Sequence, residues 1–300
     1  MRQIAYLSMD SLDDFVGYDH LTLEPLSTRG ISVETVSWRA KDVDWADFEA
    51  VVVRSPWDYQ DAPAEFLRTL ESINAVTRLE NPLAVLRWNL DKKYLREVEE
   101  RGVPIVPTAW GDAAEPVVDV VARLEASLDT VADELIVKPR VSANADDTFR
   151  LARSAVHAPA HDIQQTLAAT FAERPFMVQP FLPSVLARGE LSLFYFGGEQ
   201  LEFSHAVCKL PAAGDFRVQE EHGGSLRAVD PSPAARAAAA CALDAVPDSL
   251  LYARVDLIQD EDGAERLIEL ELIEPSLYFA FDPASPARFA DAVVRRLAPG

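Results

Sequence analysis

The sequence is poor in cysteine and has no long hydrophobic run, and each shortage excludes a class of protein. Only two cysteines occur in 300 residues, Cys208 and Cys241, and their spacing matches no metal site. We expect a reduced, intracellular protein with both thiols buried as small hydrophobic groups. No run approaches the roughly 18 apolar residues of a membrane-spanning helix. The N-terminus turns acidic at Asp10 before the apolar core of a signal peptide forms, which predicts a cytoplasmic location.

The chain also lacks positive charge. It has 49 Asp and Glu residues against 28 Lys and Arg residues, a formal net charge of −21 at pH 7. Nucleic acids and anionic membranes demand a basic surface, so neither is an expected partner. This charge does not oppose a nucleotide that arrives with Mg²⁺ and enters a locally basic cleft.

The first part of the chain alternates between apolar runs typical of strands and stretches typical of helices. Strands are expected at residues 4–7, 31–36 and 48–53, and a helix at 64–73. This alternation predicts a parallel sheet that binds ligands at the carboxyl ends of its strands. Arg54, Ser55, Trp57 and Tyr59 follow the third strand. They form either a wall of a substrate site or a proline-stiffened loop whose rings cap the core.

The strongest local signal is a hairpin near the C-terminus, where two alternating apolar runs flank Asp262-Gly263. A two-residue turn there would place Asp256 opposite Glu269, and Arg254 opposite Glu271. All four side chains would leave one face, because side chains alternate along a strand. The other face would carry the core residues Val255, Leu257, Ile268, Leu270 and Leu272.

The carboxylates of this hairpin require a compensating charge. Two of them roughly 5 Å apart repel by about 3 kcal/mol at an effective dielectric of about 20. Arg254 is one candidate, and a divalent cation is the other. The all-oxygen donor set of Asp256, Glu269 and Glu271 favours Mg²⁺ over zinc. The alternative is a solvated acidic face on an acidic protein.

Lysines begin a helix that is expected to start at Asn89 or Asp91 and to end at Gly102. Lys92 and Lys93 lie in its first turn, where they oppose the helix dipole. Such a terminus is suited to an anion such as phosphate. The alternative is a solvated lysine pair.

Lys138 ends a buried strand at residues 135–137, so its side chain either extends to solvent or points into a cleft. The small polar loop at 141–148 resembles a phosphate cover but contains no glycine, and it is therefore not a Walker A loop.

A second hairpin is expected around Gly197-Gly198, and its register would place Glu190 opposite His205. The long loop at 211–224, which follows Lys209, is expected to be functional or disordered.

Taken together, these features resemble the ATP-grasp superfamily, in particular its glutathione-synthetase-like and D-alanine–D-alanine-ligase-like branches. The matching pieces occur in the family's order: Asp91-Lys92, Val137-Lys138-Pro139, Gln179-Pro180-Phe181-Leu182, Glu190, Lys209, Arg217, Asp256 and Glu269-x-Glu271-x-x-Glu274-Pro275. The segments 54–59, 87–95 and 212–217 resemble cycloserine-synthetase-type enzymes most closely.

The resemblance implies an α/β fold with three parts. These are an N-terminal parallel-sheet pre-ATP-grasp domain (1–86), a central ATP-grasp lobe (87–181) and a C-terminal catalytic lobe (182–300). It implies a ligase that joins a carboxylate to an amine through an acyl-phosphate and releases ADP and phosphate. The substrate would be a small amino acid or peptide, and closure of a ring within one molecule is included. The alternatives are an ATP-binding regulatory protein without ligase activity, or a phosphotransferase. A homodimer is also expected.

The resemblance also implies roles for individual residues. The phosphates of ATP would contact Lys92, Lys138, Ser142 and Lys209. Its adenine would contact Gln179, Phe181 and Leu182, and its ribose Glu190. Two Mg²⁺ ions, for which Mn²⁺ can substitute, would be held by Asp256, Glu269 and Glu271. Lys209 and Arg217 would be catalytic, and the substrate would contact Arg54, Ser55, Trp57, Tyr59 and Arg254.

Two departures from the family pattern stand out. Glu271 occupies a position where relatives usually have asparagine, and the phosphate loop lacks the usual glycines. Whether Lys92 or Lys93 faces the nucleotide is left open by the sequence.

Overall fold

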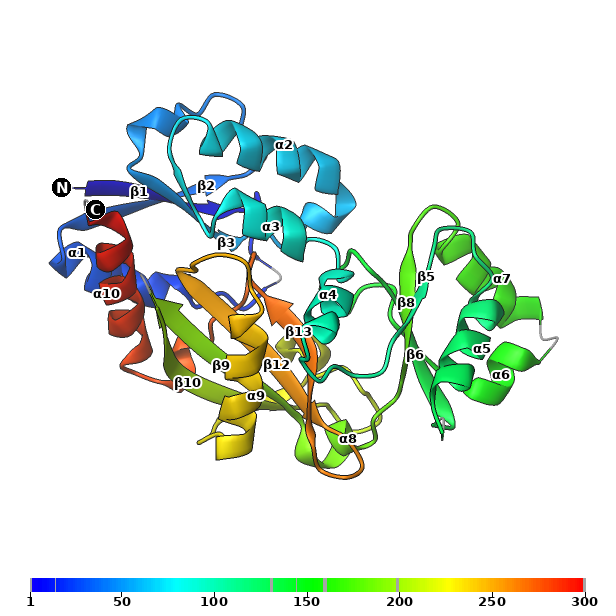
Figure 1. Ribbon diagram of the computed structural model, residues 1–300. Coiled ribbons are helices and arrows are strands. Elements are labelled where there is room, and N and C mark those ends of the chain that lie inside the picture. The colour runs from blue at the N-terminus through cyan, green and yellow to red at the C-terminus, as the bar shows by residue number, and fades with distance from the viewer. Residues whose placement is uncertain are drawn as a thin grey trace.

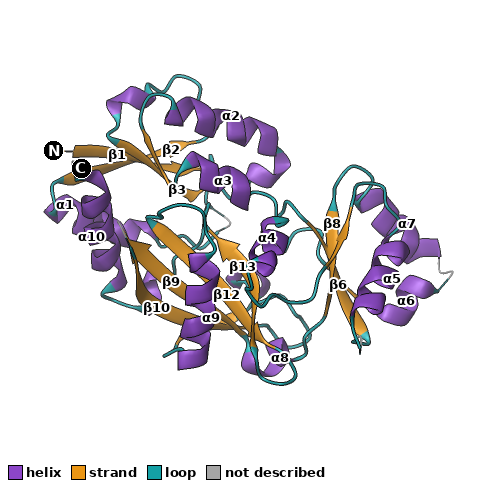
Figure 2. Ribbon diagram, in the orientation of Figure 1, coloured by secondary structure: helices purple, strands orange, loops and turns teal. Residues whose placement is uncertain are grey.

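The computed structural model describes residues 2–13, 15–129, 132–143, 145–158, 161–197 and 200–298, which form three β-sheets with their own helices (Figures 1 and 2). The N-terminal sheet has the order β2-β1-β3-β4 and is parallel throughout. The middle sheet, β5-β8-β6-β7, and the C-terminal sheet, β11-β10-β9-β12-β13, are antiparallel. The α/β class expected from the sequence is confirmed.

The N-terminal sheet is covered on both faces because consecutive residues of its central strands β1 and β3 are apolar, so both faces carry apolar side chains. Its elements are β1 (Arg2–Ser8), α1 (Leu23–Thr28), β2 (Ile31–Ser37), β3 (Ala50–Ser55), α2 (Pro63–Asn74), β4 (Arg78–Glu80) and α3 (Leu83–Asn89). Ala5 and Val51 pack with α2 on one face, and Ile4 and Val52 pack with α10 (Ser285–Leu297) on the other. The three-residue β4 was not predicted.

The middle sheet buries one face against helices and leaves the other for the cleft described below. Its elements are β5 (Ala109–Gly111), α5 (Val117–Ser127), β6 (Glu134–Pro139), β7 (Phe149–Ala152), α6 (Arg153–His157), α7 (His161–Thr170) and β8 (Phe176–Pro180). Helices α5–α7 lie on the side turned away from the rest of the molecule (Figure 1). Leu135 and Val137 face these helices, so the alternate side chains Ile136 and Lys138 face the cleft.

The C-terminal sheet carries most of the cleft floor. Its elements are α8 (Ser184–Arg188), β9 (Glu190–Gly197), β10 (Leu201–Leu210), β11 (Ser225–Ala228), α9 (Pro233–Asp244), β12 (Tyr252–Gln259) and β13 (Glu265–Glu271). Helix α4 (Tyr94–Glu100) packs against it, with Tyr94, Leu95 and Val98 in the same core as β9, β12 and β13. The domain boundaries expected from the sequence stay a prediction.

The helix predicted to start at Asn89 or Asp91 corresponds to α4 and begins later, at Tyr94, whereas α3, which ends at Asn89, was not predicted. Asn89 ends α3 with a buried amide that donates to the Leu270 carbonyl and accepts from the Leu272 N–H, both on the edge of β13. The Asp91 carboxylate then accepts from the Lys93 N–H at 2.9 Å, just before α4 begins. Gly102 ends α4 at φ +93°, as predicted.

Helix α10 brings the two ends of the chain together. It packs between the N-terminal sheet and strands β9 and β10, and Arg2 at the start of β1 donates to the Leu297 carbonyl at the end of α10. The two ends lie side by side in Figure 1. None of the helices in the described ranges is both long and apolar enough to cross a membrane.

Only one of the two thiols is buried, so the sequence-based expectation was wrong for the other. Cys208 is buried on β10, whereas Cys241 is exposed on α9. Ala235, Ala239 and Ala242 form the buried side of α9, and the helical period places Cys241 outside that stripe.

His205 is a buried neutral histidine on β10, stacked on Phe194 at a ring separation of 4.4 Å. Its Nε2–H donates to the Leu277 carbonyl (3.1 Å), and its Nδ1 accepts from the Ser204 hydroxyl (2.9 Å). Burial lowers the pKa of His205 from 6.5 to about 4.

We expect His205 to make the protein less stable in mild acid. The unfolded chain takes up a proton below pH 6.5, whereas the folded chain resists protonation down to about pH 4. The free energy of unfolding should therefore fall by about 2 kcal/mol between pH 7 and pH 4.5 from this residue alone. The measurement is urea denaturation of the wild type and His205→Gln at both pH values. A stability difference between the two proteins that does not change with pH would contradict this prediction.

Candidate active site

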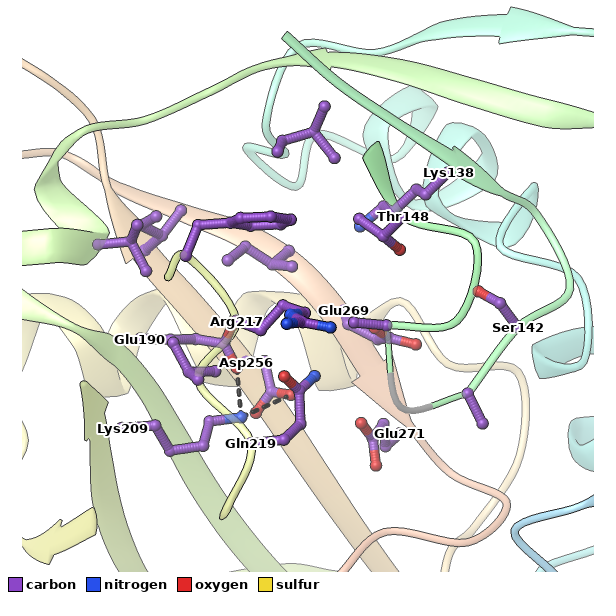
Figure 3. A pocket seen from close by; sticks show the side chains of 18 of the residues that line it. Lys138, Ser142, Thr148, Glu190, Lys209, Arg217, Gln219, Asp256, Glu269 and Glu271 are labelled. Carbon is purple, nitrogen blue, oxygen red and sulfur yellow. Dashed lines mark hydrogen bonds and ion pairs between the residues drawn. The ribbon is translucent and has the colours of Figure 1, made fainter. Parts of the chain in front are cut away.

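One cleft, with a volume of about 220 Å³, gathers side chains from the middle and C-terminal sheets and from loops next to the N-terminal sheet. Strand β6 and the loop after it form one wall, and β9, β10, β12 and β13 form the floor (Figure 3). The β10–β11 connection covers part of it, and Val16 and Trp57 close the end next to the N-terminal sheet.

The hairpin of β12 and β13 supplies the acidic floor. As predicted, Asp256 pairs with Glu269 and Arg254 pairs with Glu271, and all four side chains line the cleft. The predicted turn was wrong: Asp260 pairs with Ala264 across a three-residue loop in which Gly263 has φ +80°. The longer turn shifts the strand pairing by one residue. A bulge at Ile268 in β13 shifts it back by one residue, so the pairs at the site are those predicted.

The bulge also changes which side chain is in the core. Ile268 was predicted to face the core, but it lines the cleft beside Ile258. Leu267 is buried in the core instead. The reason is that a bulged strand presents two consecutive residues to one partner, which reverses the alternation at that point.

The second hairpin brings a lysine to the acidic floor. Glu190 lies opposite Lys209, not opposite His205, because Ser204 is bulged out and the turn is longer than two residues. Gly198, half of the predicted turn, lies outside the described residues. Lys209 is 3 % exposed and contacts both the Glu190 carboxylate and Asp256 Oδ2, the latter at 3.5 Å (Figure 3).

Arg254 contributes the second buried cation of the floor. Its Nη2 lies 2.8 Å from Asp256 Oδ2 and also contacts the Glu271 carboxylate. Burial alone would raise the pKa of Asp256, but Arg254 and Lys209 lower it to about 2. Asp256 is therefore ionised at neutral pH.

Glu271 is not fully compensated by this arrangement. Burial raises its pKa to about 8, and the charges of Asp256 and Glu269 add to this effect although Arg254 opposes it. A carboxyl group with this pKa is largely protonated at neutral pH. A cation bound beside Glu271 would favour its ionised form.

Asp256, Glu269 and Glu271 supply only oxygen donors, which fits Mg²⁺. Within the part of the chain that the structure describes, however, no three Asp, Glu, His or Cys side chains converge at metal-binding spacing. Each of the three carboxylates contacts a lysine or arginine of the protein instead. Their assignment as metal ligands therefore stays a prediction.

Lys92 faces the cleft and Lys93 does not. Lys92 is buried, with Nζ 2.9 Å from the Ser142 carbonyl and 3.1 Å from the Glu269 carboxylate. Lys93 is exposed. Lys138 lines the same wall, and burial lowers its pKa. Ser142 and Thr148 of the predicted phosphate loop also line the cleft, whereas Asn144 lies outside the described residues.

The end of the cleft next to α8 is apolar. Its side chains are Val106, Ile136, Phe181, Leu182, Val185, Val218, Ile258 and Ile268. Gln179 lines this region as well and donates to the Thr108 hydroxyl at 3.0 Å. Apolar walls with a few polar groups are typical of a pocket for a planar ring.

The β10–β11 connection positions Arg217 over the floor. Asp215 holds the Arg217 guanidinium at 2.7 Å, and this contact keeps the pKa of Asp215 well below its usual range. Gly224 is needed here because a Cβ would lie 2.2 Å from the Val218 carbonyl oxygen. Gln219 Oε1 is buried in the cleft and has no hydrogen-bond partner among the described residues, so it is available to a ligand.

The residues predicted to hold the substrate are only partly in the cleft. Trp57 and Arg254 line it. Arg54 is fully buried outside it, bound to Asp19 (3.0 Å), and Ser55 bonds to another buried serine. The placement of Arg54 and Ser55 in contact with substrate is therefore corrected, because both side chains are buried in the N-terminal sheet.

Tyr59 is also absent from the cleft wall, but it hydrogen-bonds to the Glu274 carboxylate, which does line it. Sequence reasoning assigned no role to Glu274, although it belongs to the quoted Glu-x-Glu-x-x-Glu-Pro run. Nor did it find Tyr278, which lines the cleft at φ +42° and has no local sequence signal.

Two solved structures share this arrangement of sheets. They are the ATP-grasp ligase PsnB complexed with a precursor variant, Mg and ADP (17% identity, TM-score 0.63, 98% of each chain), and the RimK domain protein ATP-grasp from Sphaerobacter thermophilus (16% identity, TM-score 0.67, 97% and 99%). They show that the chain has the fold of these proteins. That it is an ATP-grasp ligase, an enzyme that forms C–N bonds, follows from the relative of higher identity described next.

A closer relative is the cycloserine biosynthesis protein DcsG of Streptomyces lavendulae, 36% identical over 313 residues that cover 99% of both chains. The crystal structure of D-cycloserine synthetase DcsG matches with a TM-score of 0.85 and 34% identity, over 99% of this chain and 100% of that one. Residues 4–81 match the family described as D-cycloserine synthetase DcsG, N-terminal domain. The chain belongs to the D-cycloserine synthetase DcsG family.

Proposed function

We propose that the enzyme uses ATP to activate the carboxylate of a small amino acid and then closes a ring with a nitrogen of the same molecule. The observation that carries this proposal is that Lys92, Lys138 and Lys209 line the same cleft as Asp256, Glu269 and Glu271, next to an apolar end that suits adenine. D-cycloserine contains one ring amide, so the product of the relative has the bond that such a reaction would make.

The nucleotide would lie with its adenine among Phe181, Leu182 and the other apolar residues, and with its ribose near Glu190. Lys92, Lys138 and Ser142 would contact the phosphates. Asp256, Glu269 and Glu271 would hold Mg²⁺, with Mn²⁺ as a substitute, and the metal would neutralise charge on the phosphate oxygens. The all-oxygen donor set of these three side chains, which lie together on the floor of the cleft, supports this assignment.

Two steps follow. A carboxylate oxygen of the substrate bonds to the terminal phosphorus of ATP, and ADP leaves. The nitrogen then bonds to the acyl carbon, phosphate leaves with that carboxyl oxygen, and the nitrogen loses a proton. Arg217 and Lys209 would stabilise the charge that develops in the transition state. Such electrostatic stabilisation is usually the largest contribution to the catalysis of these transfers. A homodimer and a cytoplasmic location remain predictions alongside this mechanism.

The test is phosphate release from MgATP with a panel of D- and L-amino acids and dipeptides. The panel includes serine with an oxyamine nitrogen on its side-chain oxygen, free or N-acylated, since closure of that skeleton gives the cycloserine ring. We expect release with the serine derivatives and formation of a cyclic product by mass spectrometry. A stable phosphorylated product would indicate a phosphotransferase, and no stimulated release would contradict the proposal.

Two lysine variants test the phosphate wall within the same assay. Lys92→Ala should raise the KM for ATP by at least about 10-fold, because a buried charge that contacts phosphate is lost. Lys93→Ala should change it less than about 2-fold, because Lys93 is exposed. Equal effects of the two variants would contradict the assignment of Lys92.

A further inference from the structure

Five acidic side chains lie on the sheet side of the cleft, and Glu274 differs from the other four. Glu190, Asp256, Glu269 and Glu271 each form an ion pair with a lysine or arginine. Across the described ranges, Glu274 forms none, although it lines the same cavity. A desolvated carboxylate without a cation is costly unless a ligand supplies the positive charge.

Side chains that follow β3 hold Glu274 in place. The Tyr59 hydroxyl donates to its carboxylate, and the Trp57 indole N–H donates to its backbone carbonyl at 2.9 Å. Arg54 Nη2 donates to the next carbonyl, that of Pro275, also at 2.9 Å. The segment predicted to be a substrate wall therefore positions Glu274, which means that the carboxylate is fixed before a ligand binds.

The surroundings of Glu274 suit a small cationic group. Trp57, Ser276 and Tyr278 line the cleft together with it, and the Trp57 indole contacts the Glu274 backbone. Aromatic faces attract an ammonium group, and so does a carboxylate. Burial raises the pKa of Glu274 to about 7, and a bound ammonium group would favour its ionised form. If the carboxylate of an amino acid pointed toward Arg217 and the phosphate site, its α-ammonium group would point toward Glu274.

We propose that Glu274 binds the α-ammonium group of the amino-acid substrate, and that Tyr59 and Trp57 are positioning residues for it. This inference rests on the proposed function, because only an amino-acid substrate brings that group into the cleft. In this proposal the negative charge that binds the substrate belongs to Glu274, which is not one of the three carboxylates expected to hold metal.

A binding experiment tests Glu274 without requiring turnover. The probes are D-cycloserine, which carries a primary amine, and isoxazolidin-3-one, the same ring without the amine. By calorimetry, Glu274→Gln should raise the Kd for D-cycloserine about 10- to 100-fold. The Kd for isoxazolidin-3-one and that for ATP should change less than about 3-fold. Tyr59→Phe should give a smaller loss of the same pattern, and Glu274→Asp should recover part of the binding.

The outcomes separate the inference from the function on which it rests. An unchanged Kd for D-cycloserine, or equal losses for the two ring compounds, overturns the role of Glu274 even if the wild type releases phosphate. Absence of stimulated phosphate release by the wild type overturns the proposed function instead. In turnover assays, a fall in kcat with KM for the amino acid unchanged would assign Glu274 to the chemical step and overturn its role in binding.

Discussion

Replacing Glu269 by glutamine should lower ATP turnover at least about 100-fold while leaving the fold intact. Glu269 faces both Lys92 and the cleft, and its side chain keeps 24% of its exposure, so the loss of one charge costs little in folding. Its proposed work is to hold a divalent cation against the phosphates, and an amide is a much weaker ligand for Mg²⁺ than a carboxylate. The measurements are phosphate release and the Tm of each protein.

The control for this variant is Glu265→Gln, which removes the same charge from the same strand. Glu265 accepts from the Gln259 amide at 2.9 Å and does not line the cleft. Its turnover should stay within about 2-fold of the wild type. Unchanged turnover in Glu269→Gln would remove the metal assignment from this hairpin.

Replacing Lys209 by methionine should lower the free energy of unfolding by about 3–5 kcal/mol. The lysine lies between Glu190 and Asp256, and both carboxylates would be left buried with one cation fewer. Their attraction raises the pKa of Lys209 although burial opposes it, so the ammonium is charged throughout the physiological range. Urea denaturation at pH 7 measures the effect.

Lys93→Met is the matched control for this second variant, because Lys93 is exposed and forms no ion pair in the described part of the chain. Its unfolding free energy should change by less than about 0.5 kcal/mol. The loss in Lys209→Met should also shrink in acid, where Glu190 becomes protonated more readily than Asp256. A pH-independent loss equal to that of an ordinary core substitution would contradict the charge argument.

The residue pairs of the acidic floor were predicted correctly, but the turn from which they were counted was not. Counting from a two-residue turn gave the right pairs, but the turn has three residues and the bulge at Ile268 compensates. Next to this bulge, Leu267 hydrogen-bonds to the extended segment 104–106, with its N–H 2.9 Å from the Pro104 carbonyl. Such a contact between distant segments is a tertiary effect that local turn rules do not contain.

Of the site residues predicted from the sequence, those assigned to the nucleotide line the cleft more often than those assigned to the substrate. Lys92, Lys138 and Lys209 all line it, since each follows from the position of a helix start or a strand end. Arg54 shows the limit: it ends a strand of a sheet that is buried on both faces, so its position in sequence does not tell which way it points. One of its actual contacts, the Pro275 carbonyl, lies 221 residues away, and another is Asp19.

The meeting of Arg2 with the end of α10 has a practical consequence for engineering this fold. A short peptide bridging those neighbouring ends would allow the chain to be circularly permuted, with new ends opened at the exposed turn around Asp262. The permuted enzyme should keep its cleft, because the sheet that forms the floor is held in place by packing against α10, and that packing does not depend on the order in which the chain is synthesised.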